Sequence, residues 1–403
     1  MAKITIKNNK IYPLLAGHPW VFSGALLNID DSINPQIVAL HNENGDFIAY
    51  GCYKANNSIC FRVISFDKLE IDVNEFNKNY ILQEKFFYNR LIKLYEIKKS
   101  FISSNTNGFR LVNADADYLP GLIVDVYNDI AVFQISLFVM EQFIEAIVES
   151  LKKLGYKCII EKSDSQSRKI EGLSLKDTKI HFGHKQDSYE FLENGIKMLS
   201  NPFGGQKSGF FLDQRKARHW IYNNAKNKSV LNLYSYSGGF SISSLLGGAK
   251  RVVSVDVSSL AIDMCEKIIS LNDNNILNLQ LKHISVVENV IDYIKKPLEN
   301  VDIIVCDPPA FAKKRDSLKN AINAYTTINQ KCLEKLSSGG ILITSSCSGL
   351  IKMEDFINIL KKVALHTHKP IRILEIFTED VDHTKLLGFK EGEYLKTLIL
   401  QVI

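Results

Sequence analysis

A short motif in the second half of the chain combines an acid, two prolines and an aromatic residue. Asp307, Pro308 and Pro309 follow the apolar run VDIIVC, and Phe311 lies two positions further on. Two consecutive prolines hold the backbone extended and present carbonyl oxygens without N–H donors. Such a turn can hold a planar base, because Asp307 can accept hydrogen bonds from ring N–H groups while Phe311 stacks on the ring face. A purely structural proline turn is the alternative.

A cysteine occupies the equivalent place after the next apolar run. The segment GGILITSSCSG places Cys347 among serines, just before Gly349. Cysteines are more often small buried hydrophobes than nucleophiles. We interpret Cys306, inside an apolar run, in that way, and extend this interpretation to the five remaining cysteines. The polar surroundings of Cys347 instead favour a reactive thiol.

A glycine-rich turn, SYSGGF, lies upstream between an apolar run and a predicted helix. Adjacent Gly238 and Gly239 let a ligand approach the backbone closely. Asp256 follows the next apolar run, eighteen residues after Gly238, where a carboxylate can bind ribose hydroxyls. Neither G-x-G-x-x-G nor G-K-[ST] is present, so an adenosine ligand without a pyrophosphate fits best. The turn predicts S-adenosylmethionine and, with the proline motif, methyl transfer; glycines that only end a strand are the alternative.

The segment NPFGGQKSGFFLDQRKAR, residues 201–218, joins flexible glycines to a dense set of polar side chains. The polar residues are Lys207, Asp213, Gln214, Arg215 and Arg218, around Phe210 and Phe211. Such a segment suits a loop that closes over a charged ligand. The alternative is a solvated linker followed by a helix that begins at Asp213. The histidines show no metal-ligand spacing, so no metal is predicted.

Strands and helices alternate from about residue 200, and this alternation positions the motifs. The predicted strands are 229–234, 251–257, 279–285, 301–307 and 339–346, and the predicted helices are 240–247, 258–272, 289–296, 317–336 and 353–365. Such alternation is typical of a doubly wound parallel sheet, whose ligands bind at the carboxyl ends of the strands. The closing run EYLKTLILQV has no crossover helix before it, so we expect it to pair antiparallel at or near the sheet edge.

The first half of the chain has a different pattern of apolar residues and turns. Short alternating runs with glycine turns over residues 1–70 predict a small all-β unit. A period near 3.6 over residues 73–100 predicts a helix, and two strands joined at Asn128-Asp129 follow. Mixed strands and helices therefore predict an α+β domain over residues 71–195, with the parallel sheet over residues 196–403.

Composition excludes several classes of protein. The 403 residues carry a net charge of +5, too small for a nonspecific nucleic-acid coat but compatible with a local basic groove. The N-terminus lacks the apolar core of a signal peptide, and charges interrupt the most apolar stretch, residues 130–148, so no membrane association is expected. Seven cysteines without a C-x-x-C pair argue against disulfides and zinc. We expect a cytoplasmic protein.

Taken together, the motifs resemble the class I S-adenosylmethionine-dependent methyltransferases that act on large-subunit ribosomal RNA, in the group with an N-terminal PUA domain that makes 5-methylcytosine. The resemblance extends over nearly the whole chain, through GHPWVFSGAL (17–26), RLVNADADYLPGLIVDVY (110–127), RKIEGL (168–173), GGQKSGFFLDQR (204–215), NLYSYSGGFS (232–241), DPPAF (307–311) and SCSGL (346–350). It implies a PUA-like β-barrel over 1–70, a central α+β domain over 71–195 and a Rossmann-like methyltransferase domain over 196–403.

The resemblance also implies roles for individual residues. The cofactor site would comprise Phe211, Asp213, Gln214, Arg215, Tyr236, Ser237, Gly238, Gly239, Phe240, Asp256, Asn289 and Asp307. Asn289 stands where the family often has an aspartate that contacts the adenine. The substrate site would comprise Lys207, Pro308, Pro309 and Phe311. Cys347 would attack carbon 6 of cytosine so that carbon 5 accepts the methyl group, with Asp307 at the cytosine edge.

Two alternatives stay open. The Asp-Pro-Pro-aromatic motif is close to that of amino-methyltransferases, and Ala310 stands where some cytosine-5 enzymes carry a second cysteine. N-methylation of guanine or adenine, with Cys347 inert, is therefore the second hypothesis. A noncatalytic RNA-binding factor is the third. The expected partner is large-subunit ribosomal RNA. A homodimer is a further option.

We expect basic side chains to line one RNA-binding cleft. The set comprises the basic residues of 1–65, with Lys207, Arg215, Arg218, Lys313, Lys314 and Arg315. Trp20 could either stack on RNA or fill the core of the N-terminal unit.

Overall fold

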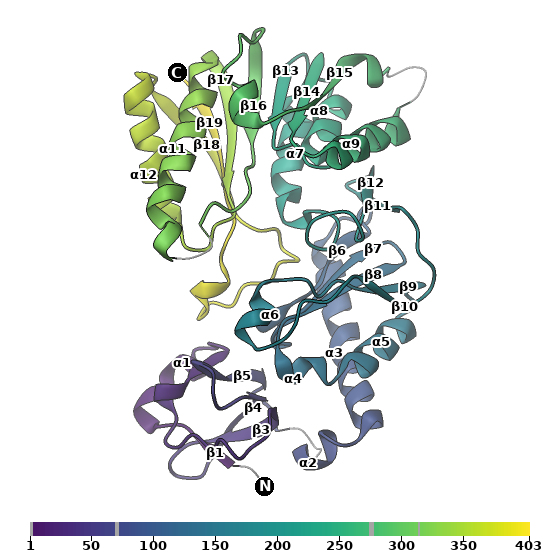
Figure 1. The fold of residues 1–403 in the computed structure, drawn as a ribbon, viewed down its shortest axis with the longest axis vertical. Helices are drawn as coiled ribbons and strands as arrows, with labels where there is room; N and C mark the ends of the chain where they lie inside the picture. Colours follow the sequence, from purple (N-terminus) through teal and green to yellow (C-terminus); the bar gives the residue numbers. More distant parts are fainter. Residues whose placement is uncertain (1–2, 69–71, 274–277, 313–314) are drawn as a thin grey trace. The chain divides into compact units, whose positions relative to one another are not determined.

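The computed structural model describes residues 3–68, 72–273, 278–312 and 315–403 (Figure 1). The chain divides into two compact units. The first holds Met1–Phe191, Ser200–Gly209 and Val381–Gly392, and the second holds Leu192–Leu199, Phe210–Asp380 and Glu393–Ile403. The chain therefore passes from one unit to the other five times. The expected β-unit and nearly all of the expected α+β domain share the first unit, while the boundaries near 70 and 195 stay predictions.

The first unit begins with a five-stranded sheet in the order β1-β3-β4-β5-β2. Its elements are β1 (Lys3–Thr5), α1 (Tyr12–Leu15), β2 (Trp20–Phe22), β3 (Gln36–His41), β4 (Phe47–Tyr53) and β5 (Ile59–Ser65). β1 runs parallel to β3, and the other neighbouring strands run antiparallel. Leu40, Phe61 and Val63 are buried in its core. The small all-β unit predicted from the alternating runs is confirmed.

A second five-stranded sheet, in the order β10-β9-β8-β7-β6, follows in the same unit. Its strands are β6 (Gly108–Asn113), β7 (Leu122–Tyr127), β8 (Ile130–Ile135), β9 (Cys158–Glu161) and β10 (Lys179–Phe182), and its helices are α2 (Val73–Phe76), α3 (Tyr80–Phe101), α4 (Phe138–Glu141), α5 (Ile144–Lys153) and α6 (Ser167–Ile170). Asn79 caps α3 by accepting from two backbone amides, and Phe87 and Leu91 bury its apolar face. The turn at Asn128-Asp129 between β7 and β8 is confirmed.

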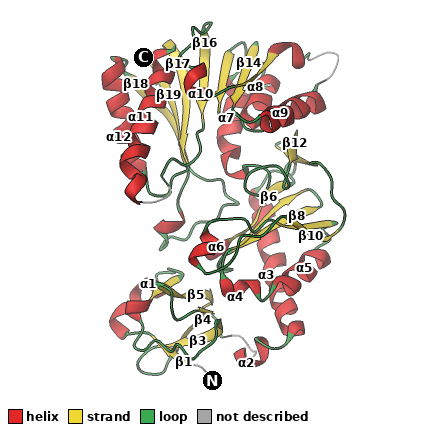
Figure 2. Cartoon of the chain, in the orientation of Figure 1, coloured by secondary structure: helices red, strands yellow, loops and turns green. Residues whose placement is uncertain are grey.

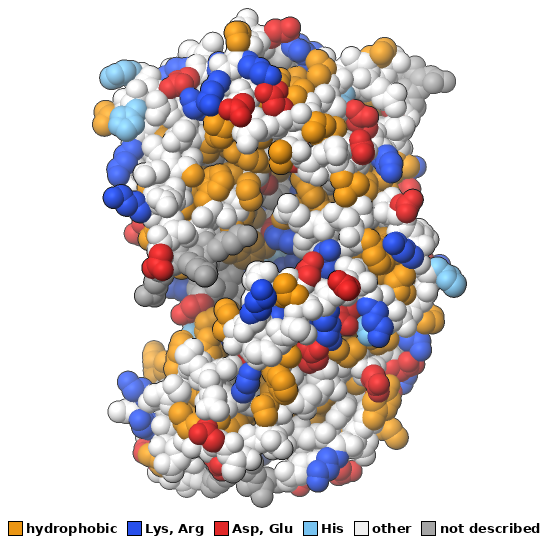
Figure 3. All heavy atoms as spheres, viewed as in Figure 1, with side chains coloured by type: hydrophobic (Ala, Val, Ile, Leu, Met, Phe, Trp, Pro, Cys, Tyr) orange, Lys and Arg blue, Asp and Glu red, His pale blue; other side chains and the backbone are white. Residues whose placement is uncertain are grey.

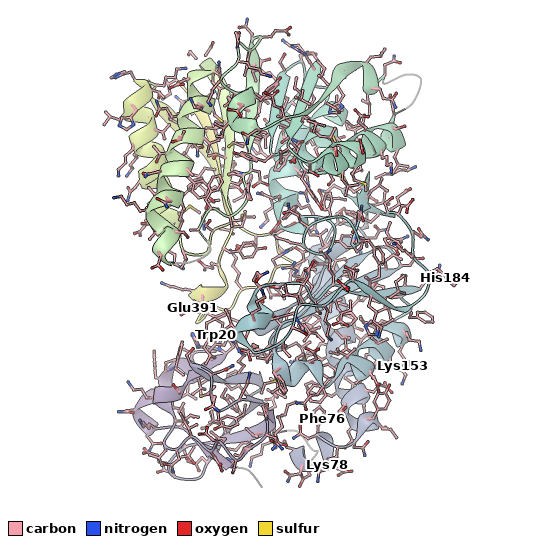
Figure 4. The ribbon with its side chains drawn as sticks, in the orientation of Figure 1. Trp20, Phe76, Lys78, Lys153, His184 and Glu391 are labelled. Carbon is pink, nitrogen blue, oxygen red and sulfur yellow. The ribbon has the colours of Figure 1, made fainter. Side chains whose placement is uncertain are left out.

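A late segment of the chain, Val381–Gly392, completes the first unit. Oδ2 of Asp382 accepts a hydrogen bond from the backbone N–H of Arg110 at 2.8 Å, and Thr384 donates to Asp117 at 2.7 Å. Figure 4 labels Glu391 from this segment near Trp20 of β2. The ring of Trp20 lies 4.7 Å from that of Phe389, so Trp20 packs against this late segment.

The second unit is built on a seven-stranded sheet in the order β15-β14-β13-β16-β17-β19-β18. The strands are β13 (Ser229–Leu233), β14 (Arg251–Asp256), β15 (His283–Val287), β16 (Val301–Cys306), β17 (Leu336–Ser346), β18 (Ile371–Phe377) and β19 (Lys396–Val402). The first five are parallel, whereas β19 runs antiparallel to both β17 and β18. A β-hairpin of β11 (Tyr189–Glu193) and β12 (Ile196–Ser200) precedes the sheet.

Helices cover both faces of this sheet. They are α7 (Arg215–Asn224), α8 (Gly239–Leu246), α9 (Ser259–Asn272), α10 (Val290–Tyr293), α11 (Leu318–Glu334) and α12 (Met353–Thr367). Figure 2 shows α8 and α9 on one side and α11 and α12 on the other. Successive strand residues face opposite sides, and Leu231 and Leu233 pack into the core that includes α11 and α12. The predicted doubly wound α/β arrangement is confirmed.

Three details differ from the sequence-based expectations. The helix expected at 289–296 is only a four-residue turn, α10, which Asn289 caps and which ends at Tyr293. The strand expected at 279–285 begins only at His283, because the buried Leu279 is the N-cap of a short 3-10 helix, Gln280–Lys282. The sequence analysis also missed β18, whose residues are mostly exposed along the edge of the sheet. In the described part of the chain, no helix is long and apolar enough to cross a membrane.

Candidate active site

The candidate active site lies where the sheet of the second unit changes winding direction. β14 lies on one side of β13 and β16 on the other, so the connections from β13 and β16 leave in opposite directions. Leu233 at the end of β13 is paired with Cys306 of β16, which in turn is paired with Thr344 of β17. The glycine-rich turn, the proline motif and Cys347 therefore emerge at one edge of the sheet. Ligands of open α/β sheets bind at this kind of switch point.

The turn after β13 is held in a strained, compact form. Tyr236 and Gly238 have positive φ angles of 47° and 78°. The backbone N–H of Tyr236 donates to Oδ2 of Asp256 at 2.9 Å, while that of Ser258 donates to Oδ1 at the same distance. A Cβ atom on Gly238 would lie 2.1 Å from Sγ of Cys265. Asp256 therefore braces a turn that glycine alone can form without a clash.

This turn fits a polar nucleoside-bearing ligand. Among the described residues, the hydroxyls of Ser235 and Ser237 are buried without a hydrogen-bond partner. Buried polar groups are normally paired, so such hydroxyls indicate a ligand or water that supplies the missing bonds. Gly239 opens α8, and Phe240 is buried behind it. The residues present are thus compatible with the predicted S-adenosylmethionine.

Residues 211–214, just before α7, lie next to the turn after β13. The ring of Phe211 meets that of Tyr236 edge-on, with centroids 5.0 Å apart. Asp213 is buried, and its Oδ2 accepts a hydrogen bond from the Tyr394 hydroxyl at 2.6 Å. These contacts place Phe211 next to the predicted cofactor turn. They leave its binding role a prediction.

Gln214 connects three strand ends in a network the sequence did not reveal. Its Nε2 donates to Oδ1 of Asp307 and to Oγ of Ser345, both at 3.0 Å. Its Oε1 accepts from the hydroxyl of Thr397 at 3.0 Å. Gln214 thus orients the Asp307 carboxylate at the end of β16. A cofactor contact for Gln214 stays a prediction.

Arg215 and Arg218 do not face an RNA-binding cleft, contrary to the sequence-based expectation. Arg215 is 5% exposed and donates to Asp380 at 2.8 Å. Arg218 is 3% exposed and makes a bidentate pair with Glu193, at 2.6 and 2.7 Å. That expectation is therefore wrong for these two residues, because acids distant in the sequence bury and neutralise them.

For the other basic residues the expected RNA-binding cleft stays a prediction. Lys207 is exposed and belongs to the first unit. Lys313 and Lys314 lie outside the described residues, and the side chain of Arg315 is likewise not described. Figure 3 shows basic and acidic side chains interspersed on the face that it draws.

The proline motif and the cysteine turn are joined to each other. Of the seven cysteines, six are buried as predicted and Cys347 is partly exposed. Its Sγ lies 3.8 Å from the carbonyl oxygen of Pro308. Oγ of Ser348 accepts a hydrogen bond from the backbone N–H of Ala312 at 3.3 Å and lies 3.1 Å from the Tyr325 hydroxyl. These contacts bring a thiol and the predicted base-binding turn together.

The aromatic residue of the motif is only partly available for stacking. Phe311 packs on Tyr325 with ring centroids 4.8 Å apart and keeps part of its surface exposed. Pro308 is buried, and Pro309 is exposed. Phe311 could therefore contact a base with its free surface only.

Asn289 is used as a helix cap. Its Oδ1 accepts from the backbone N–H of Ile291 at 2.9 Å, at the start of α10, and the residue is exposed. Because the cap uses Oδ1, the side-chain NH₂ of Asn289 is the group that could donate to an adenine. An adenine contact through this group stays a prediction.

Lys396 is a site residue that the sequence analysis missed. It opens β19 and pairs in register with Ser346, the residue before Cys347. Lys396 is 6% exposed, and its Nζ donates to the carbonyl oxygens of Ser348 at 2.7 Å and Tyr394 at 2.8 Å. Burial lowers the pKa of Lys396 to about 8, although the charges of Cys347 and Glu379 oppose that shift. A single lysine within the apolar closing run was the one signal available beforehand.

Comparison with protein families gives two matches. A model described as an S-adenosylmethionine-dependent methyltransferase matches residues 171–377, and a PUA-like domain model matches residues 4–66. Curated relatives extend over almost the whole chain. Proteins named ribosomal RNA large subunit methyltransferase I are 36% identical over 392 residues in Aeromonas salmonicida and 33% over 389 residues in Aliivibrio fischeri, each alignment covering 96% of both chains. The protein of that name from Salmonella arizonae is 30% identical over 404 residues, covering all of this chain and 98% of the relative.

Solved structures share the complete fold. A candidate S-adenosylmethionine-dependent methyltransferase from Streptococcus mutans superposes with a TM-score of 0.79 at 24% identity, covering 100% of both chains. A second candidate methyltransferase, solved in complex with SAH, gives 0.81 at 24% identity with the same coverage. At this identity the likeness establishes the fold.

Proposed function

Because this chain belongs to the S-adenosylmethionine-dependent methyltransferase family, and within it to the ribosomal RNA large subunit methyltransferase I group, we propose that it methylates carbon 5 of a cytosine in large-subunit ribosomal RNA. The observation that supports the choice of base is the contact of Cys347 with the Asp307-Pro308 turn, where Sγ lies 3.8 Å from a carbonyl oxygen of the turn. A thiol beside a base-binding turn suits covalent activation of a pyrimidine ring. The proposed ribosomal RNA substrate supports a location in the cytoplasm.

The chemistry begins with the thiolate of Cys347. Its sulfur forms a bond to carbon 6 of the cytosine, and the ring takes up a proton as electron density moves to carbon 5. S-Adenosylmethionine, when bound, would supply the methyl group from its sulfonium sulfur. Loss of the methyl group would turn that sulfur into a neutral thioether. After carbon 5 carries the methyl group, its proton is released to water. The sulfur–carbon 6 bond then breaks and the ring gives up the proton that it took up at the start, which restores the neutral aromatic ring and the Cys347 thiolate.

Asp307 has a defined part in this scheme. Gln214 orients its carboxylate through Oδ1, and Oδ2 can accept a hydrogen bond from the cytosine edge. A carboxylate at that edge favours the protonated ring that forms after the thiol adds. Pro308 contributes its carbonyl oxygen beside the thiol, and the free surface of Phe311 covers the ring.

The proline motif also supports a second candidate, N-methylation of guanine or adenine. Asp307 and the carbonyl of Pro308 could hold an exocyclic amine next to the methyl donor in the same place. In that reaction Cys347 forms no bond to the base. The two candidates therefore differ in whether the thiol is needed.

Replacement of the cysteine separates these candidates. We expect Cys347→Ala and Cys347→Ser to lose cytosine methylation of large-subunit ribosomal RNA, followed as radioactive methyl transfer and by analysis of the nucleosides. RNA that carries 5-fluorocytosine should trap the wild-type protein covalently, because fluorine at carbon 5 cannot leave as a proton does. Cys158→Ala, a buried cysteine of the first unit, is the matched control. Full activity of Cys347→Ala, or a methylated purine as product, would reject the cytosine mechanism.

A further inference from the structure

A buried lysine lies next to the thiol that the proposed function uses. Lys396 opens β19, in register with Ser346 at the end of β17. Both carbonyl groups that hold its Nζ belong to residues close to the site, since Ser348 directly follows Cys347 and Tyr394 donates a hydrogen bond to Asp213. The ammonium is thus fixed at the turn that carries the thiol.

Burying a lysine this deeply costs free energy unless a negative charge faces it. Lys396 is 6% exposed, and its Nζ donates to two neutral carbonyl oxygens. A methionine of similar length would fill the same space without desolvating a charge. The placement therefore indicates an electrostatic role.

The charge relation between Lys396 and Cys347 is mutual. A thiolate at Cys347 raises the pKa of Lys396 and so favours its ammonium form. Because the interaction energy of two charges belongs to both of them, the ammonium favours the thiolate equally. The thiolate charge also raises the pKa of Tyr325, although burial is the larger cause there. The negative charge of Cys347 thus raises the pKa of both Lys396 and Tyr325.

We propose that the ammonium of Lys396 is the charge partner that keeps Cys347 in its nucleophilic thiolate form. The proposal rests on the proposed function, in which Cys347 attacks the cytosine ring. Lys396 is a positioning residue, because it acts through Cys347 and through the Ser348 carbonyl that it holds. A thiol of ordinary acidity, with a pKa near 8.5, is mostly protonated at neutral pH and needs such help.

Other charged groups surround Lys396 and modulate it. Glu379, which is buried, favours the ammonium, and its Oε1 accepts from the backbone N–H groups of Tyr394 and Leu395 at 2.6 and 2.7 Å. At the start of α12, Lys352 disfavours the ammonium and Asp355 favours it. Glu379 and Asp355 thus help to retain a positive charge that burial opposes.

The proposal is tested by the alkylation of Cys347 as a function of pH. The six other cysteines are buried, so iodoacetamide applied to the intact, folded protein reports mainly on Cys347. Mass spectrometry of the Cys347 peptide gives its rate between pH 6 and 10. We expect a wild-type midpoint below about 8.5, the value of a free thiol. Lys396→Met should move the midpoint up by about one unit or more, which is about tenfold slower alkylation at pH 7.

Two further variants exclude a merely structural effect. Lys396→Arg keeps the charge and should retain most of the wild-type pH profile, whereas Lys361→Met, at an exposed position of α12, should match it fully. In methyl transfer, Lys396→Met should lower kcat with little change in KM, and the loss should shrink at high pH, where the thiolate forms unaided.

Unchanged alkylation in Lys396→Met would overturn the proposal. If that variant does not fold, a wild-type midpoint at or above that of a free thiol overturns it equally. Alkylation needs neither RNA nor cofactor, so its outcome is separate from that of Cys347→Ala, which decides the proposed function.

Discussion

The side-chain amide nitrogen of Gln214 lies 3.0 Å from a carboxylate oxygen of Asp307. The contact joins the segment before α7 to the end of β16, and the same amide also reaches Ser345 and Thr397. Gln214 is buried, so these bonds do not exchange freely with water. A carboxylate held in this way can face a substrate in one orientation.

Changing Gln214 should therefore disturb catalysis through Asp307. Gln214→Glu keeps the size of the side chain but replaces the donor with a negative charge next to Asp307. A hydrogen bond to a charged group contributes about 1.5–3 kcal/mol, so we expect kcat for methyl transfer to fall about 10- to 100-fold. Gln280→Glu, at an exposed position of the same unit, is the control for the added charge. Equal kcat values in the two variants would contradict the assigned contact.

Gly238→Ala should weaken cofactor binding. The new Cβ would lie 2.1 Å from Sγ of Cys265, and φ at this position is 78°. Either effect displaces the turn, so we expect calorimetry with S-adenosylmethionine to show at least about tenfold weaker binding, a cost of about 1.4 kcal/mol. Adding Cys265→Ala removes the sulfur and leaves Cβ of residue 265 at 2.8 Å, so this double variant should recover only part of the loss.

Gly24→Ala is a matched control, because its Cβ would meet nothing within 4 Å and its φ is not positive. Wild-type affinity in Gly238→Ala would show that the turn does not contact the cofactor.

Breaking the pair between Arg218 and Glu193 should destabilise the second unit. Arg218→Met leaves the Glu193 carboxylate, 2% exposed, with Arg215 at 3.7 Å as a remaining partner. We expect a loss of about 3 kcal/mol in the free energy of unfolding, measured with urea. Adding Glu193→Gln should restore part of that stability.

The same variant tests the burial of Arg218. RNA affinity of the folded protein should stay at the wild-type value, as it should for Lys228→Met at an exposed position. A selective loss of RNA binding in Arg218→Met would show that the guanidinium reaches the RNA.

The second unit should lose stability in mild acid because of His283. Burial lowers the pKa of His283 in the folded protein to about 4, from 6.5. Between these values the unfolded chain binds a proton that the folded chain does not, so stability falls as the pH drops from about 6.5 to about 4. The shift corresponds to at most about 3 kcal/mol.

Fluorescence of Trp220, in a Trp20→Phe background, can follow this unit through urea unfolding at each pH, because the chain has two tryptophans. His283→Gln should flatten the pH dependence in that range. An equal slope in both proteins would show that other groups cause the acid sensitivity.

Local patterns predicted much of the second unit. The apolar runs that became β13, β14, β16 and β17 are buried on both faces, and each is followed by residues that apolar packing does not explain, such as Asp307 and Cys347. For this reason both the parallel sheet and the location of the motifs followed from the sequence. Roles of the individual residues in binding and catalysis remain predictions.

Features that depend on distant partners were not predictable. Arg215 and Arg218 resemble surface residues until Asp380 and Glu193, 165 and 25 residues away, neutralise them. The position of Lys396 beside Ser346 depends on the pairing of β19 with β17, which the local sequence does not reveal. β18 escaped notice because it borders the sheet and lacks the buried pattern of a central strand.

The chain passes between the two units five times, so parts of the first unit are made late in translation. Arg110 and Asp117 acquire their partners Asp382 and Thr384 only after 272 and 267 further residues have been made. At about 5–20 residues per second, that interval lasts roughly 13–55 s. During this delay Asp117 can already bind Lys98 and the backbone N–H of Asn113, so the contacts that Arg110 and Asp117 still lack are those to Asp382 and Thr384. Because both units include segments from the last part of the chain, neither is complete until translation is nearly finished.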